Sequence, residues 1–131
     1  MQLTRHTDYA LRVLMYLAKS PDKLCSAAEI AEYYSISRNH LVKVVQGLTE
    51  HNFVVTTRGN HGGMKLAVAA EDISVGYVVR NLENHFNVVE CFDDKSAGCK
   101  IQSSCKLKGV VFRAVNNFLD ELDQTHLSDL L

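Results

Sequence analysis

Residues 26–48 read SAAEIAEYYSISRNHLVKVVQGL, and this stretch contains two helix starts separated by a tight break. Ser26 and Glu29 have the spacing of a capping box, which predicts a short helix that runs to about Tyr34. Ser37 is a natural cap for the next helix. The apolar residues of that second helix recur at helical spacing and are Leu41, Val44, Val45 and Leu48. The pattern predicts a helix-turn-helix.

The flanking sequence predicts a further helix and a β-hairpin. Upstream, apolar residues recur at helical spacing over residues 7–19. Downstream, FVVTT at residues 53–57 has the β-branched and aromatic content of a strand, and a partner strand is expected over residues 64–68. The glycines of RGNHGG, residues 58–63, allow a tight tip between the strands. Three helices and a hairpin form a winged helix-turn-helix, which we expect over residues 1–70 as a DNA-binding domain.

Residues 71–131 are expected to add a helix, a loop and a long helix. Ser74 can cap a helix whose apolar positions fall within residues 75–82, and residues 84–105 show no sustained periodicity. The last helix is expected to reach about Gln124, and its apolar stripe consists of Leu107, Val111, Ala114, Phe118 and Leu122. A symmetric second copy is the commonest cover for such a stripe, so we expect a homodimer. The expected fold class is mainly α with a small β-hairpin.

The composition is that of one compact globular protein. The chain has 131 residues, of which 47% are hydrophobic and 22% charged. No apolar run approaches the ~20 residues that cross a bilayer, so we expect a cytoplasmic protein with no membrane partner. The first 70 residues carry eight Lys or Arg against five Asp or Glu, whereas the remainder carries six against ten. This asymmetry favours a polyanion-binding N-terminal region. An enzyme is not expected, because the sequence lacks a Ser/His/Asp set, a phosphate-binding loop and a His-Glu-x-x-His pattern.

The helix after Ser37 and the hairpin tip are the candidate DNA-binding elements. A helix fits the major groove of double-stranded DNA, where Arg pairs with guanine and Asn with adenine. The candidate residues on the helix are Arg38, Asn39, His40, Lys43 and Gln46. Those at the hairpin tip, which can approach phosphates or a minor groove, are Arg58, Gly59, His61, Gly62 and Gly63. An ordinary solvated helix face is the alternative, but the order of motifs and the charge asymmetry favour DNA.

Three of the four cysteines lie close together as Cys91-x7-Cys99-x5-Cys105. In a reducing compartment such a group indicates metal or redox chemistry, and thiolates are ligands for zinc and for iron–sulfur clusters. Structural zinc sites more often use Cys-x2-Cys pairs, so the wide spacing favours a cluster. Metal-free redox thiols and incidental cysteines are the alternatives.

The spacing leaves the fourth ligand open, and the candidates are Asp8, His85, Glu90, Asp93 and Cys25. Asp8 also suits an ion pair with Arg12, four residues further along the first helix. Cys25 stands apart in a connection between helices and is expected to be a packing residue.

Several of these stretches resemble a known family. They are MQLT at residues 1–4, TDYALR at 7–12, SRNHLVK at 37–43, RGNHGG at 58–63, and the three clustered cysteines. Over essentially its whole length, the sequence resembles the nitric-oxide-sensing repressors of the Rrf-type family of bacterial winged-helix regulators. The resemblance implies a homodimeric repressor in which the long C-terminal helices cross and each subunit holds one iron–sulfur cluster.

The resemblance also implies roles for individual residues. Cys91, Cys99 and Cys105 would be ligands, and Asp8 of the other subunit would complete a [4Fe-4S] cluster. Relatives that bind a [2Fe-2S] cluster use a His three residues after the last Cys, where this sequence has Lys108. Nitric oxide would disrupt the cluster and release the operator DNA. The alternatives are a [2Fe-2S] or thiol-based redox regulator on the same scaffold, and a cluster carrier that needs no DNA.

Overall fold

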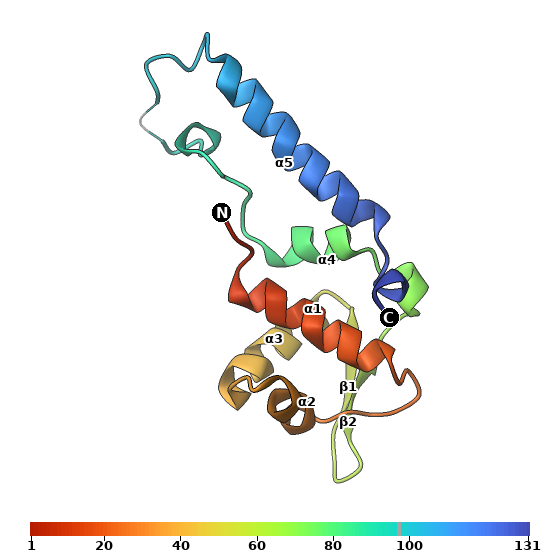
Figure 1. Cartoon of the computed structure of the whole chain (residues 1–131). Coiled ribbons are helices and arrows are strands. Elements are labelled where there is room, and N and C mark those ends of the chain that lie inside the picture. The colour runs from red at the N-terminus through yellow and green to blue at the C-terminus, as the bar shows by residue number, and fades with distance from the viewer. Residues whose placement is uncertain (97) are drawn as a thin grey trace.

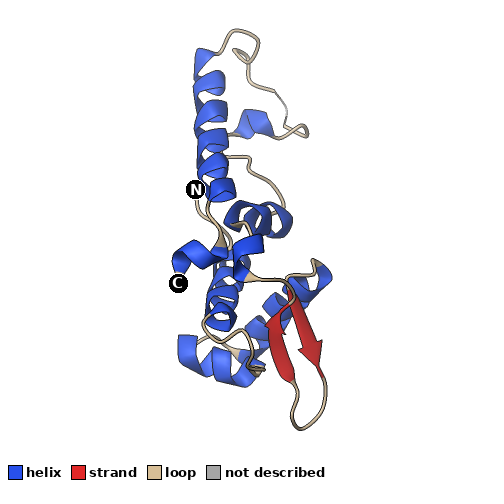
Figure 2. Ribbon diagram, turned by 90° about the vertical axis from the view of Figure 1, so that its right-hand side faces the viewer, coloured by secondary structure: helices blue, strands red, loops and turns tan. Residues whose placement is uncertain are grey.

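The computed structural model of the chain describes residues 1–96 and 98–131. It is mostly helical with one two-stranded antiparallel hairpin, which confirms the expected fold class (Figures 1 and 2). The elements are α1 (Arg5–Ala18), α2 (Ala27–Tyr34), α3 (Arg38–Glu50), β1 (Val54–Thr57), β2 (Gly63–Leu66), α4 (Val75–Leu82) and α5 (Lys106–Gln124). Three short 3-10 helices cover Ala70–Asp72, Glu90–Phe92 and Leu127–Leu130. In the described part of the chain, every helix is too short or too polar to span a membrane.

Side-chain caps fix where the helices begin. At each start a hydroxyl oxygen accepts a hydrogen bond from the backbone amide three residues later, satisfying a donor that the helix leaves free. The capping residues are Thr4 for α1, Ser26 for α2, Ser37 for α3 and Ser74 for α4. Between α2 and α3 the backbone of Ser35 adopts the left-handed conformation, with φ of 55°. The two helices thus begin at the serines that the sequence indicates, and the predicted helix-turn-helix is confirmed.

One hydrophobic core joins the three N-terminal helices, the hairpin and parts of the C-terminal region. Leu14, Leu41 and Leu48 are fully buried at its centre. Val78 of α4 and Leu127 near the C-terminus belong to the same core. The winged helix is therefore packed against α4 and the last residues of the chain, and its position relative to them is fixed by side-chain contacts.

The hairpin begins its second strand earlier than predicted. Val54 pairs with Leu66 and Thr57 pairs with Gly63, so β2 covers residues 63–66 and not 64–68. A Cβ atom at Gly63 would lie 2.9 Å from the carbonyl oxygen of Cys25. The connection between α1 and α2 thus packs directly on the start of β2, next to the hairpin tip, and only glycine permits this approach.

Helix α5 extends away from the winged helix. The segment between α4 and α5, which contains the clustered cysteines and is called the cysteine loop below, therefore lies at the far end of the molecule. Figures 1 and 2 both show the hairpin and the loop before α5 at opposite ends. The C-terminal part of α5 packs on α4 through Leu119, which is 3% exposed, against Val75 and Val79. Arg80 of α4 and Asp123 of α5 add a bidentate ion pair, with 2.7 Å between Nη2 and Oδ2.

Candidate functional site

Most of the predicted DNA-reading residues of α3 lie on its solvent-exposed face. Arg38, Asn39, Lys43 and Gln46 are exposed, whereas the apolar face of the helix is buried in the core. The amide of Gln46 donates a hydrogen bond to Glu50 at 3.0 Å. An exposed polar face on the second helix of a helix-turn-helix has the geometry needed to enter a major groove.

His40 differs from the other residues of this set. It is half-buried, and its ring packs edge-to-face against the ring of Tyr9 on α1, with 4.8 Å between the ring centroids. The side chain of His40 is thus held by a neighbouring helix and is less free to adapt to a base than Arg38 or Asn39. The sequence pattern could not reveal this contact, because Tyr9 and His40 are brought together only by the packing of α1 on α3.

The wing carries three of its predicted residues at an exposed tip, whereas Gly62 is half-buried and Gly63, also half-buried, is the first residue of β2. Arg58, Gly59 and His61 are exposed, and Gly59 has a φ of 110°, a conformation that favours glycine. A Cβ atom at Gly62 would overlap the carbonyl oxygen of Thr57. Gly62 and Gly63 therefore have structural reasons to be glycine that are independent of DNA.

The three clustered cysteines are brought only partly together. Cys91 and Cys105 are half-buried and line the same hollow, whereas Cys99 is exposed on the loop between them. Within residues 1–96 and 98–131 no group of three or more His, Cys, Asp or Glu is close enough to hold a metal ion. The single chain thus presents two thiols on one surface and a third on an exposed loop.

The chemistry of these residues fits an iron–sulfur cluster. Three thiols are soft donors of the kind that iron–sulfur clusters use, and the hollow beside Cys91 and Cys105 is also lined by Arg80 and Lys108. Of the other candidates, Cys25 is buried in the core, and burial raises the pKa of its thiol. The prediction that Cys25 is a packing residue is confirmed.

Asp8 lies in the first turn of α1 and forms the ion pair that its spacing predicts. Its carboxylate accepts hydrogen bonds from Nε and Nη2 of Arg12, at 3.2 and 2.8 Å. The Asp8 side chain is nevertheless 47% exposed. The carboxylate is accordingly accessible to a group outside this chain.

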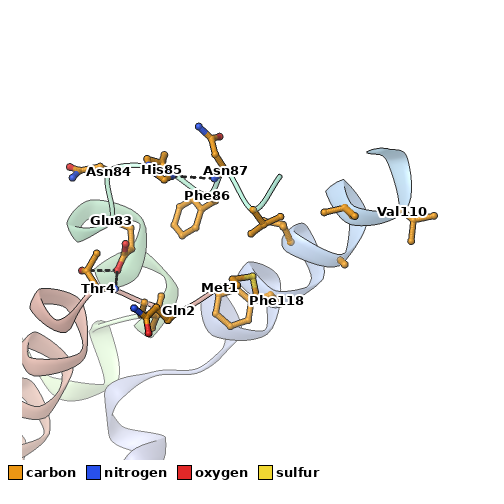
Figure 3. A pocket seen from close by; sticks show the side chains of 15 residues that line it. Met1, Gln2, Thr4, Glu83, Asn84, His85, Phe86, Asn87, Val110 and Phe118 are labelled. Carbon is orange, nitrogen blue, oxygen red and sulfur yellow. Dashed lines mark hydrogen bonds between the residues drawn. The ribbon is translucent and has the colours of Figure 1, made fainter. Parts of the chain in front are cut away.

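An apolar groove runs along α5. It is lined by the first four residues of the chain, the segment of residues 83–88, and the α5 side chains Val110, Val111, Ala114, Val115 and Phe118 (Figure 3). Leu107, Val110 and Phe118 are 65%, 52% and 39% exposed. The predicted apolar stripe of α5 is therefore mostly uncovered, although Leu122 packs in the small core beside α4.

Glu83 is a positioning residue that the sequence analysis missed. It follows the last residue of α4, and its carboxylate accepts hydrogen bonds from the backbone amide and the hydroxyl of Thr4, at 2.8 and 2.9 Å (Figure 3). Burial acts to raise the pKa of Glu83, but hydrogen bonds from Thr7 and Thr4 outweigh it and lower the pKa below its usual value. Glu83 thus connects the start of the cysteine loop to the start of α1. No local sequence pattern predicts this long-range contact.

Comparison with known proteins places the chain among transcriptional regulators. Residues 3–131 match the Rrf2 family, described as iron-dependent transcriptional regulators. The whole chain is 47% identical to the regulator NsrR of Bacillus subtilis and 45% identical to that of Bacillus licheniformis, covering 90% and 92% of those proteins. The structure of Staphylococcus aureus CymR in its oxidized form has a TM-score of 0.80 and 29% identity, with 99% of this chain and 95% of that chain covered. The chain therefore belongs to the Rrf2 family, whose members are transcriptional regulators and not enzymes.

Proposed function

We propose that the protein is a homodimeric transcriptional repressor that binds operator DNA and releases it when nitric oxide reacts with an iron–sulfur cluster. The observation that carries the proposal is the pair of thiols, Cys91 and Cys105, that line one hollow at the end of the molecule remote from the wing. It occurs in a chain whose family is described as iron-dependent. We propose nitric oxide as the effector because the sequence resembles nitric-oxide-sensing repressors.

The DNA-binding part of the proposal is supported by the exposed polar face of α3 and by the wing. Arg38 and Asn39 stand at the N-terminal end of α3, the end that commonly contacts base edges in this motif. Arg58 and His61 are exposed at the wing tip, and in this proposal they contact the sugar–phosphate backbone beside the same groove. A dimer then presents two such units to two half-sites about one helical turn, ~34 Å, apart.

The dimer is supported by the uncovered apolar face of α5. A face with Leu107, Val110 and Phe118 exposed is costly to leave in water. Pairing with the same face of a second copy buries it in a symmetric contact. We also propose the cytoplasmic location that the sequence predicts, because the protein must reach its operator DNA.

The cluster would be held by Cys91, Cys99 and Cys105, with Asp8 of the second subunit as fourth ligand and one [4Fe-4S] cluster per subunit. When bound, it would supply iron that reacts with nitric oxide. Asp8 is exposed at the start of α1, and Glu83 fastens that same region to the start of the cysteine loop. These residues connect the cysteine loop to α1, which packs on α3. In the cluster-bound dimer, this connection would hold the two recognition helices at a spacing that fits DNA.

A second candidate is a thiol-based redox regulator on the same scaffold. It is favoured by the observation that Cys91 and Cys105 share the hollow while Cys99 lies outside it. In that case two thiols, and no iron, would respond to an oxidant.

Spectroscopy of protein purified without oxygen tests both candidates. We expect a broad visible band with about four irons per chain, which nitric oxide bleaches. Cys99→Ala should remove the band, whereas Cys25→Ala, the matched control in the core, should retain it. Colourless protein without iron would contradict the proposed cluster and favour the thiol-based regulator. A [2Fe-2S] spectrum with two irons per chain would show that the proposed cluster type is wrong.

A further inference from the structure

One apolar side chain lies exposed in the middle of the polar face of α3. Val42 is 55% exposed and belongs to neither hydrophobic core of the chain. The other exposed residues of this helix are all polar or charged, and they are Arg38, Asn39, Lys43, Gln46 and Glu50. Val42 follows Arg38 by four residues and precedes Gln46 by four, so these three side chains are neighbours on one face of the helix.

Neither packing within the chain nor helix formation explains a valine at this position. The apolar residues that hold α3 in the fold lie on its buried face, and they are Leu41, Val44, Val45 and Leu48. Valine is a weaker helix former than Ala, Lys or Gln, because branching at Cβ restricts its side chain. Single exposed valines are common on protein surfaces, but Val42 lies among the candidate base-reading residues. Its position therefore indicates a contact that forms when DNA is bound.

The major groove offers a valine one apolar partner on the base edges, the C5 methyl group of thymine. The other groups that distinguish the bases there are hydrogen-bond donors and acceptors. Covering those groups with a valine side chain costs free energy, because no new hydrogen bond replaces the one to water. Val42 lies in the second turn of α3, near the N-terminal end that contacts base edges in this motif. Its short, branched side chain also has few rotamers to lose on contact.

We propose that Val42 is a specificity-determining residue that packs against the C5 methyl group of a thymine in each half-site of the operator. The inference rests on the DNA-binding part of the proposed function, and it adds a base preference that hydrogen bonds do not supply. The contact involves no cysteine and no cluster ligand, because it requires only that α3 lie in the major groove. Since Arg38 and Gln46 flank Val42 along the helix, we expect the thymine to lie between the bases that those two side chains reach.

Replacing thymine by deoxyuridine tests the contact, because deoxyuridine lacks the C5 methyl group and keeps the hydrogen-bonding groups of the base. An operator duplex is first selected from a random library with the full-length protein purified without oxygen. Each thymine of the selected duplex is then replaced in turn, at the matching positions of both half-sites. At one position we expect the wild-type affinity to fall about fifteenfold, because burying one methyl group contributes about fourfold in each half-site.

Val42→Ala should remove this response. The alanine side chain is too short to reach the methyl group, so the variant should bind the thymine and deoxyuridine duplexes with about equal affinity. The variant should fold normally, because Val42 is exposed and alanine is the best helix former. The matched control is Val68→Ala, which removes another exposed valine, 47% exposed, that follows β2 and lies outside α3. It should retain the full response to deoxyuridine.

Two results overturn the inference. One is a wild-type protein whose affinity falls at none of the thymines when the methyl group is removed. The other is a Val42→Ala protein that loses as much affinity on deoxyuridine substitution as the wild type, which would assign the effect to another side chain or to the shape of the DNA. In both cases the selected operator remains, and with it the DNA-binding part of the proposed function. A wild-type protein that selects no sequence from the library overturns that part of the proposed function and the inference together.

Discussion

Replacing Phe118 with alanine is expected to dissociate the dimer and to leave each subunit folded. Phe118 is 39% exposed on the apolar face of α5 and belongs to neither hydrophobic core of the chain. A Phe side chain offers about 200 Å² of surface, so contact with a second copy covers about 80 Å² that is exposed in the monomer. At ~25 cal/mol per Å² this contributes about 2 kcal/mol for each subunit. A twofold dimer contains the contact twice, so the loss is about 4 kcal/mol, or a dissociation constant roughly a thousandfold higher.

Sedimentation equilibrium of cluster-free protein over a range of concentrations measures this dissociation constant. The matched control is Tyr77→Ala, which removes another aromatic side chain that is 57% exposed but lies on α4. It should leave the dissociation constant unchanged. Circular dichroism should show the same helix content and nearly the same melting temperature for Phe118→Ala as for the wild type at concentrations where both are monomeric. Dimers of equal strength in wild type and Phe118→Ala would refute the assignment of this face to dimerisation.

Three further predictions concern the wing, α1 and the recognition helix. Gly63→Ala should destabilise the fold by about 1–3 kcal/mol in urea unfolding, because the new methyl group meets the Cys25 carbonyl at 2.9 Å and backbone cannot yield. Glu83→Gln should cost about 1 kcal/mol at neutral pH, since the charge that accepts two hydrogen bonds from Thr4 is lost. Because the folded pKa of Glu83 is lowered, its contribution is present above the ordinary pKa of Glu, ~4.3, and the difference in melting temperature should vanish as the pH falls through the folded value. Arg38→Ala should weaken binding to a selected operator by about 1–3 kcal/mol and relax the base preference at one position.

Each of these predictions has a control and a contradicting result. Gly109→Ala, at a position where a Cβ atom meets only the end of the Arg113 side chain at 3.5 Å, should be tolerated, and equal stability of the Gly63 and Gly109 variants would contradict the packing argument. A melting-temperature difference for Glu83→Gln that grows toward acid would reverse the expected sign. For Arg38, equal loss of affinity for operator and random duplexes would assign the residue to the phosphate backbone instead of to a base.

The parts of the fold that the sequence predicts well are those set by local signals. Ser26, Ser37 and Ser74 each cap a helix, and each is followed by apolar residues at helical spacing. The start of the second strand was harder to predict, because β2 begins at Gly63, where the chain packs against Cys25, which lies 38 residues earlier. The second apolar edge of α5, formed by Val115 and Leu119, was missed for the same reason, since it is defined by α4.

The residues of the candidate site also fall into two groups, those that local sequence patterns predict and those that depend on tertiary packing. The exposure of Arg38, Asn39 and Lys43 follows from the amphipathic pattern of α3, and the pairing of Asp8 with Arg12 follows from their spacing on one helix. The packing of His40 on Tyr9 and the attachment of Glu83 to Thr4 depend on how distant segments meet. Contacts of this kind become visible only in three dimensions.

The proposed function is tested most directly by the affinity for operator DNA of one anaerobic sample, measured before and after stoichiometric nitric oxide. The affinity is measured by fluorescence anisotropy while the visible spectrum is recorded. We expect tight, salt-dependent binding by the coloured protein, and a loss of affinity that parallels the bleaching of the visible band. Bleaching without any change in operator affinity would contradict the proposed function, because the cysteine site would then be uncoupled from the recognition helices.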